Sequence, residues 1–69
     1  RYYWKWVVLL IGNELGYQKM EMHELLKHKF LADTSKDLDR EEFNTYLETI
    51  RCWAMQELGI KVPLPNEID

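Results

Sequence analysis

Cysteine is nearly absent from this chain, because Cys52 is the only one among 69 residues. A single cysteine cannot pair within the chain, so disulfides cannot stand in for a hydrophobic core. Small extracellular domains commonly rely on such bridges. The sequence therefore predicts an intracellular protein of a reducing compartment, with Cys52 as a small, half-buried thiol.

Positive charge is also scarce. The chain has nine Lys and Arg residues and twelve Asp and Glu residues, which gives a net charge of −3. Binding to nucleic-acid phosphates depends on clustered Lys and Arg, so this balance argues against DNA binding by the chain alone. The basic residues nearest to aromatic rings are Arg1, Lys5 and Arg51. Because rings beside cations can stack on unpaired bases, the candidate partner or nucleic-acid contacts are Trp4, Lys5, Trp6 and Arg51, although core packing accounts for most of the rings.

Long hydrophobic runs are missing as well. The longest extends from Tyr2 to Ile11 and is broken only by Lys5. A bilayer span takes ~20 apolar residues, and no small-residue cleavage site of a signal peptide follows the run. We therefore expect no membrane segment. The run predicts a helix that is apolar on most sides and buried on more than one face, as in a fragment of a longer protein.

The stretch HELLKHKF, residues 23–30, differs by one residue from HExxH, the helix motif that binds zinc in metalloproteases. Its histidines, His23 and His28, stand five residues apart. At ~100° per residue, that spacing turns the two rings ~140° from each other, so they cannot share one ion. Glu24 and His28 do share a face, but two ligands are fewer than zinc requires. The expected outcome is one partly buried and one solvated histidine, without a metal.

Acidic residues follow in a pattern that begins like a calcium loop. Oxygen-bearing side chains fall at every second residue from Asp33 to Asp39. The pattern then breaks, because Leu38 stands where the loop needs Gly and Asn44 where it needs a bidentate Glu. A Gly-rich phosphate loop and a Ser/His/Asp or Cys/His set in recognisable context are also missing. The sequence therefore predicts no catalytic residue, metal site or cofactor, and a chain that is not an enzyme.

Apolar spacing predicts three helices. The first runs from about Tyr2 to Leu15, where Gly16 ends it in a left-handed conformation. The second runs from about Lys19 to Leu31, and the third follows an Asp39 cap and ends at Gly59. The apolar stripes of the second and third helices, which we expect to be buried, consist of Met22, Leu25, Leu26 and Phe30, and of Phe43, Tyr46, Leu47, Ile50, Trp53, Ala54 and Leu58.

The segment after Gly59 cannot continue as a helix, because Pro63 and Pro65 each remove an amide donor and restrict the preceding residue. Its alternating apolar residues can cover the helices. The predicted fold class is all-α: a small three-helix domain with an extended, proline-containing C-terminal tail packed on it. The whole chain, residues 1–69, forms a single helical domain in this interpretation.

Two runs of the chain, ELGYQKMEMHELLKHKFL and TSKDLDREEFNTYLETIRCWAMQELGIKVPLPNE, carry a family resemblance. They resemble a small helical region of bacteriophage recombination proteins of the phage lambda Orf (NinB) type and of related phage replication-recombination proteins. The likeness covers most of the chain from Leu15 onward. The link from Phe30 to Ser35 is shorter here than expected for the family. Its features are residues 15–17, 22–24, 35–38, 42–43, 46–47, 50–51, 53–54, 58–60 and 63–66, together with Lys27 and Phe30.

The resemblance implies an accessory factor in the cytoplasm of a bacterial host, acting where recombinases load on single-stranded DNA. Such a factor meets single-stranded DNA, single-strand-binding protein, or both. Because this segment is acidic, we expect a non-catalytic interaction or scaffold domain whose partner is the rest of the parent protein or a second copy. Contact with DNA would then come through the parent protein. The alternative is the non-catalytic helical region of a phage nuclease, which an upstream His/Asn/His constellation would favour.

Overall fold

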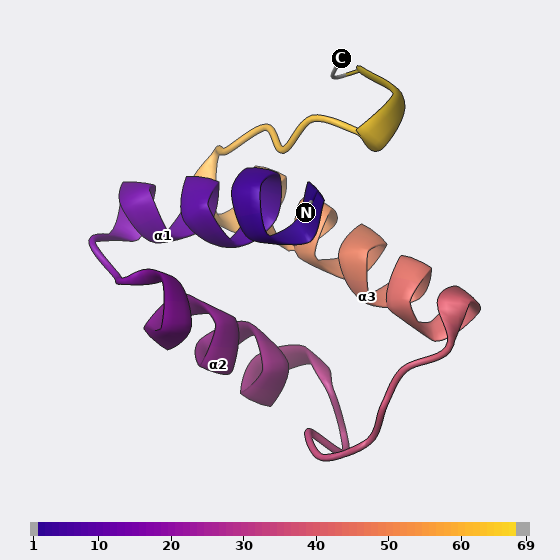
Figure 1. Cartoon of the computed structure of the whole chain (residues 1–69). Helices are drawn as coiled ribbons and strands as arrows, with labels where there is room; N and C mark the ends of the chain where they lie inside the picture. Colours follow the sequence, from indigo (N-terminus) through magenta and orange to yellow (C-terminus); the bar gives the residue numbers. More distant parts are fainter. Residues whose placement is uncertain (1, 68–69) are drawn as a thin grey trace.

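A computed structural model describes residues 2–67, and within this range the chain is helical without a strand. The first helix combines a π-helical segment with an α-helix and is joined by a short link to the second helix (Figure 1). An irregular loop leads to the third helix, which again ends in a π-helical turn. The elements are η1 (Tyr3–Val8), α1 (Leu9–Leu15), α2 (Lys19–Phe30), α3 (Arg40–Trp53), η2 (Ala54–Leu58) and the short 3₁₀ turn η3 (Pro65–Glu67).

The helix ends lie where the sequence places them. Gly16 and Gly59 adopt the left-handed conformation, with φ of 82° and 67°. A left-handed residue is the usual end of a helix, and glycine adopts it without a Cβ clash. At the start of α3, the Asp39 carboxylate accepts from the Glu42 amide at 2.8 Å, and the Glu42 carboxylate accepts from the Asp39 amide at 3.0 Å. The predicted capping arrangement is confirmed.

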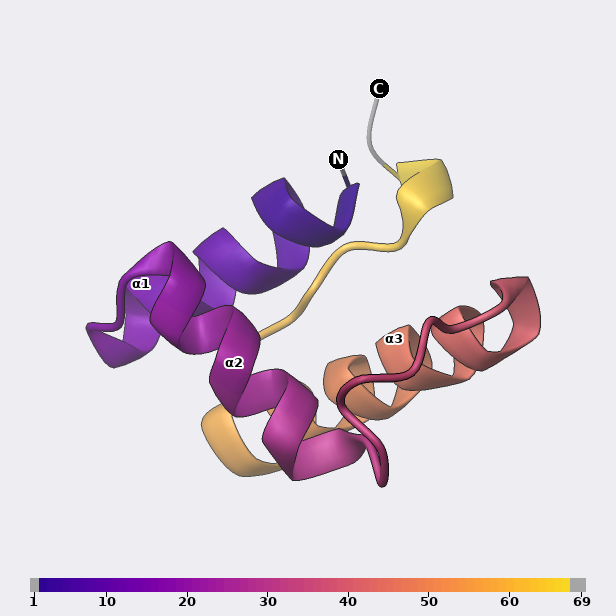
Figure 2. The same cartoon turned by 60° about the horizontal axis from the view of Figure 1, so that its bottom comes forward.

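A close approach at Gly12 fixes the turn between α1 and α2. The Tyr17 amide donates to the Gly12 carbonyl at 2.8 Å. A Cβ atom at position 12 would lie 3.0 Å from the Tyr17 carbonyl oxygen and 3.3 Å from the Met22 Cβ. Only a residue without a side chain lets the two helices approach this closely. The helices therefore run side by side in opposite directions (Figures 1 and 2).

The hydrophobic core lies between the first helix, α2, α3 and the tail. The most completely enclosed side chains are those of Val7, Val8, Ile11, Leu26 and Ile50. The tail passes beside the first helix in both views (Figures 1 and 2). There Val62 is buried, and the Tyr2 hydroxyl donates to the Pro63 carbonyl at 2.5 Å. The predicted all-α domain with a tail packed on it is thus confirmed.

Several burial predictions are wrong or only partly right. Cys52 is exposed, because it lies on the outer face of α3 and not toward the core. Leu25 is 43% exposed although it belongs to the apolar stripe of α2, because that stripe is wider than the surface that α1 and α3 cover. Trp53, which the spacing predicts in the core, is half-buried, and so are Phe30, Phe43 and Leu58. Between residues 2 and 67, no helix is both long and apolar enough to cross a membrane.

Candidate functional site

The aromatic and cationic side chains singled out in the sequence lie on separate parts of the molecule. The Trp4 ring packs on His23 of α2, with 4.5 Å between ring centroids. The Lys5 ammonium lies 5.5 Å from the centroid of the Trp6 ring. Arg51 pairs with Glu48, beside the tail. Arg1 lies outside the described residues. These rings and cations therefore make contacts within the domain. Those in the described residues are not brought together into one cationic groove.

The two histidines face different neighbours, as their spacing predicts. His23 is half-buried, whereas the His28 side chain is 70% exposed and lies 3.8 Å from the Glu24 carboxylate. Within residues 2–67, no group of three or more His, Cys, Asp or Glu side chains is placed to hold a metal ion.

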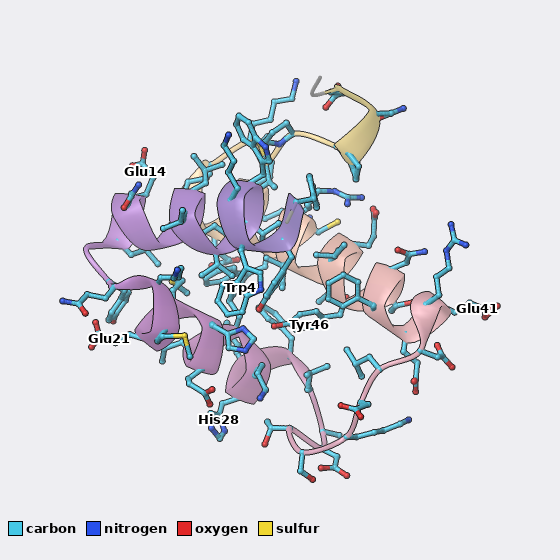
Figure 3. All side chains as sticks on the ribbon, in the orientation of Figure 1. Trp4, Glu14, Glu21, His28, Glu41 and Tyr46 are labelled. Carbon is cyan, nitrogen blue, oxygen red and sulfur yellow. The ribbon has the colours of Figure 1, made fainter. Side chains whose placement is uncertain are left out.

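Three hydrogen-bonded side chains, Tyr3, His23 and Tyr46, connect the first helix, α2 and α3. We call this set the buried polar chain. The Tyr3 hydroxyl lies 2.7 Å from His23 Nδ1 and 3.0 Å from the Tyr46 hydroxyl. Figure 3 shows Tyr46, the α3 member of this set, in the middle of the molecule near Trp4. Tyr3 and Tyr46 are buried, and their rings also contact Phe43. A phenol hydroxyl can both donate and accept, so Tyr3 is able to hydrogen-bond to His23 and Tyr46 at the same time.

The surroundings of these three side chains favour their uncharged forms. Burial, reinforced by the hydrogen bond with Tyr46, raises the pKa of the Tyr3 phenol above its ordinary value. Burial also raises the pKa of Tyr46, and the hydrogen bond with Tyr3 partly offsets this. Burial and the nearby Lys27 ammonium lower the pKa of His23, while Glu24 has the opposite, smaller effect. At neutral pH all three groups are therefore uncharged, which removes the cost of burying an ion.

A polar cleft of about 450 Å³ lies beside this chain, where the loop between α2 and α3 meets both helices. Two polar side chains of its loop, Ser35 and Lys36, pair with residues outside the cleft lining. The Lys36 ammonium donates to Glu42 at 2.5 Å, which lowers the pKa of that carboxyl. The Ser35 hydroxyl donates to Asp33 at 2.7 Å. The loop beside the cleft is thus held by a hydrogen bond within the loop and by one to α3.

A second hollow is apolar, and we call it the α2 groove. It has a volume of about 410 Å³ and lies between the end of α1, the outer face of α2 and the end of α3. Three of its large apolar side chains are more than a third exposed: Leu15 at 39%, and Tyr17 and Leu25 at 43%. The residues that line it are Leu15, Tyr17, Met22, Leu25, Leu26, His28, Lys29 and Trp53.

Sequence reasoning missed the α2 groove, although its signal is present. Leu25 follows helical spacing with Met22 and was assigned to the core, but helical spacing alone does not tell a covered stripe from an uncovered one. Lys29 follows Leu25 by four positions, so the two side chains lie on the same side of α2. The Lys29 ammonium lies 5.4 Å from the centroid of the Trp53 ring. The same helical spacing of apolar residues thus accounts for the α2 side chains in the core and for those that line the groove.

Comparison with known proteins gives no match: no family model, no curated protein and no solved structure matches this chain. The fold class rests on the structure itself. The family resemblance of the two sequence runs remains a prediction.

Proposed function

We propose that this chain is a non-catalytic helical interaction domain of a phage-type recombination accessory protein, a mediator associated with single-stranded DNA and single-strand-binding protein. In this proposal the domain makes protein contacts. Any strong contact with DNA belongs to the parent protein. The phage assignment is supported by the family resemblance of the runs from Leu15 onward.

The observation that carries the proposal is the amount of large apolar side chain left uncovered on a domain of this size. Single exposed hydrophobic residues are common on protein surfaces, whereas a contiguous exposed patch marks a contact surface. Leu15, Tyr17 and Leu25 meet in the α2 groove. Further exposed apolar side chains are Leu9, Met20, Met55 and Leu64. These side chains favour a partner protein over a nucleic acid.

The charge distribution supports the same conclusion. A single-strand binder combines stacking rings with a cationic groove that follows the phosphates. Here Trp4 is occupied by its contact with His23, and Arg51 by its pair with Glu48. With a net charge of −3, the chain repels a polyanion at long range.

Two measurements on the same sample test the proposal. Fluorescence anisotropy with labelled oligo-dT should show no saturable binding at physiological salt. Light scattering over a range of concentrations, alone and with purified single-strand-binding protein, should show self-association or a complex. Tight oligo-dT binding by a monomer, steeply weakened by salt, would overturn the proposal. In that case Trp4, Trp6 and Arg51 would be the residues to substitute first.

A further inference from the structure

We infer that the α2 groove binds a short apolar peptide segment that carries carboxylates. The inference rests on the proposed function, because it names the kind of partner that the interaction domain takes. Its ligand is defined by two properties of the groove: apolar walls, and a rim that carries the Lys29 ammonium with no Asp or Glu among the described lining residues.

The walls of the groove suit leucine- or phenylalanine-sized side chains. Met22 and Leu26, both buried, lie at its base, and the half-buried Trp53 ring closes the side toward α3. The exposed side chains of Leu15 and Leu25 stand on its sides. Partner grooves of this kind gain affinity by burying apolar anchors in a preformed hollow.

The rim of the groove is unusual for an acidic chain. Among the described residues that line it, the ionisable ones are Tyr17, His28 and Lys29, and none is Asp or Glu. The neighbouring hollow between the end of α2 and α3 is different, because Asp33, Glu41 and Glu42 line it. A carboxylate on the partner can therefore approach Lys29 without meeting a carboxylate of the groove wall.

Lys29 is already positioned for such a contact. Its ammonium lies 5.4 Å from the Trp53 ring centroid and 5.8 Å from that of Phe30, so two aromatic rings hold the cation at the groove. The nearby Glu24 carboxylate is directed to His28 on the outer side of α2. Within residues 2–67 the Lys29 ammonium forms no ion pair, so it is available to the ligand.

A second copy of the chain fits the groove less well than an acidic peptide. In a symmetric dimer the same patch meets itself, so two Lys29 ammonium groups would enter one interface with no Asp or Glu among the described lining residues of either groove. Like charges brought together at an interface oppose association. Self-association of this chain should therefore use its other exposed apolar side chains, such as Leu9 and Met55.

The test uses three short fluorescein-labelled peptides of identical leucine and phenylalanine content, with glutamate, glutamine or lysine at the remaining positions. Anisotropy titrations with the whole chain should rank them glutamate, glutamine, lysine. We expect the glutamate peptide to bind up to about fivefold more tightly than the glutamine peptide, as for a partly exposed ion pair. That difference should shrink as salt rises from 0.1 M to 1 M, because the screening length falls to ~3 Å.

Two variants and a matched control locate the binding. Lys29→Gln should abolish most of the preference for glutamate over glutamine. Leu25→Ala should weaken all three peptides by about threefold to tenfold, because it removes apolar surface from the groove wall. Lys5→Gln is the control, since Lys5 also lies over a tryptophan ring, at 5.5 Å, but away from the groove. It should change nothing.

The outcomes are distinct. Absence of binding by the glutamate peptide, equal binding of all three peptides, or equal losses with Lys5→Gln and Lys29→Gln would overturn the inference. If the chain nevertheless associates with itself or with single-strand-binding protein, and Lys29→Gln leaves that association intact, the inference fails while the proposed function stands. Tight oligo-dT binding by a monomer would instead overturn the proposed function.

Discussion

Replacing Tyr3 by phenylalanine isolates the hydrogen bonds of the buried polar chain from its packing. Tyr3→Phe retains a ring that contacts Trp4 and Phe43 at centroid distances of 5.4 and 5.6 Å. Only the hydroxyl is lost, together with its contacts to His23 at 2.7 Å and to Tyr46 at 3.0 Å. Any change in stability therefore reports on the polar chain.

The expected loss follows from the two partners left behind. His23 is half-buried and can turn to water, so its lost hydrogen bond costs little. The Tyr46 hydroxyl has no other hydrogen-bond partner within residues 2–67, and a buried polar group left unsatisfied costs about 1–3 kcal/mol. For a domain of this size, each kcal/mol corresponds to about 4–8 °C in Tm. We therefore expect Tm to fall by about 4 °C or more.

The assay is thermal and urea unfolding followed by far-ultraviolet circular dichroism, with Tyr46→Phe and the double variant measured alongside. Removing both hydroxyls leaves no orphaned group between the two rings, so the double variant should lose less stability than the two single losses added together. A Tyr3→Phe change within about 0.5 kcal/mol of zero, as for an ordinary surface substitution, would refute this reasoning. Additive single and double effects would refute it as well.

Four further outcomes are expected. Asp39→Ala should cost about 1 kcal/mol in urea unfolding, because it removes the α3 cap; Asn, which keeps a capping oxygen, should restore most of it. Trp53→Ala should cost about 3 kcal/mol, the low end of the range for large core rings, since Trp53 is half-buried; a folded variant of unchanged Tm would show that the ring serves the groove alone. Because the pKa of folded His23 is lowered, the unfolded chain binds the proton more readily below about pH 6.5, so stability should fall as pH drops from 7 to 5; His23→Gln should flatten this slope, whereas His28→Gln should not. Zinc or calcium should leave Tm unchanged, since an ion that binds only the folded state raises it.

Most of the fold could be predicted because its signals are local. Gly16, Gly59 and the pair of Asp39 and Glu42 specify where helices begin and end through conformations of their own backbone. The tail could be recognised because proline excludes a helix. The π-helical segments Tyr3–Val8 and Ala54–Leu58 were not predictable in the same way. They depend on a ladder of hydrogen bonds whose register no side-chain pattern of this sequence specifies.

The candidate sites were less predictable, because they depend on contacts between distant residues. Tyr3 and Tyr46 are 43 positions apart, and only the packing of the first helix against α3 brings their hydroxyls together. Leu25 has the spacing of a core residue, and its exposure depends on how much of the α2 stripe the neighbouring helices cover. The spacing of His23 and His28, by contrast, was sufficient to predict that they face different surroundings, since both lie on one regular helix.

The hydrogen bond from Tyr2 to Pro63 joins positions 61 residues apart, which has a consequence for the order of folding. The turn at Gly12 closes a short loop and can form early, whereas closing a loop of this length costs more entropy and needs the rest of the domain in place. Docking of the tail should therefore be a late step. In the folded protein, release of the tail should uncover the first helix, so hydrogen exchange at Val7 and Val8 should report on tail detachment. Val62→Ala would accelerate that exchange before it measurably lowers the helical content.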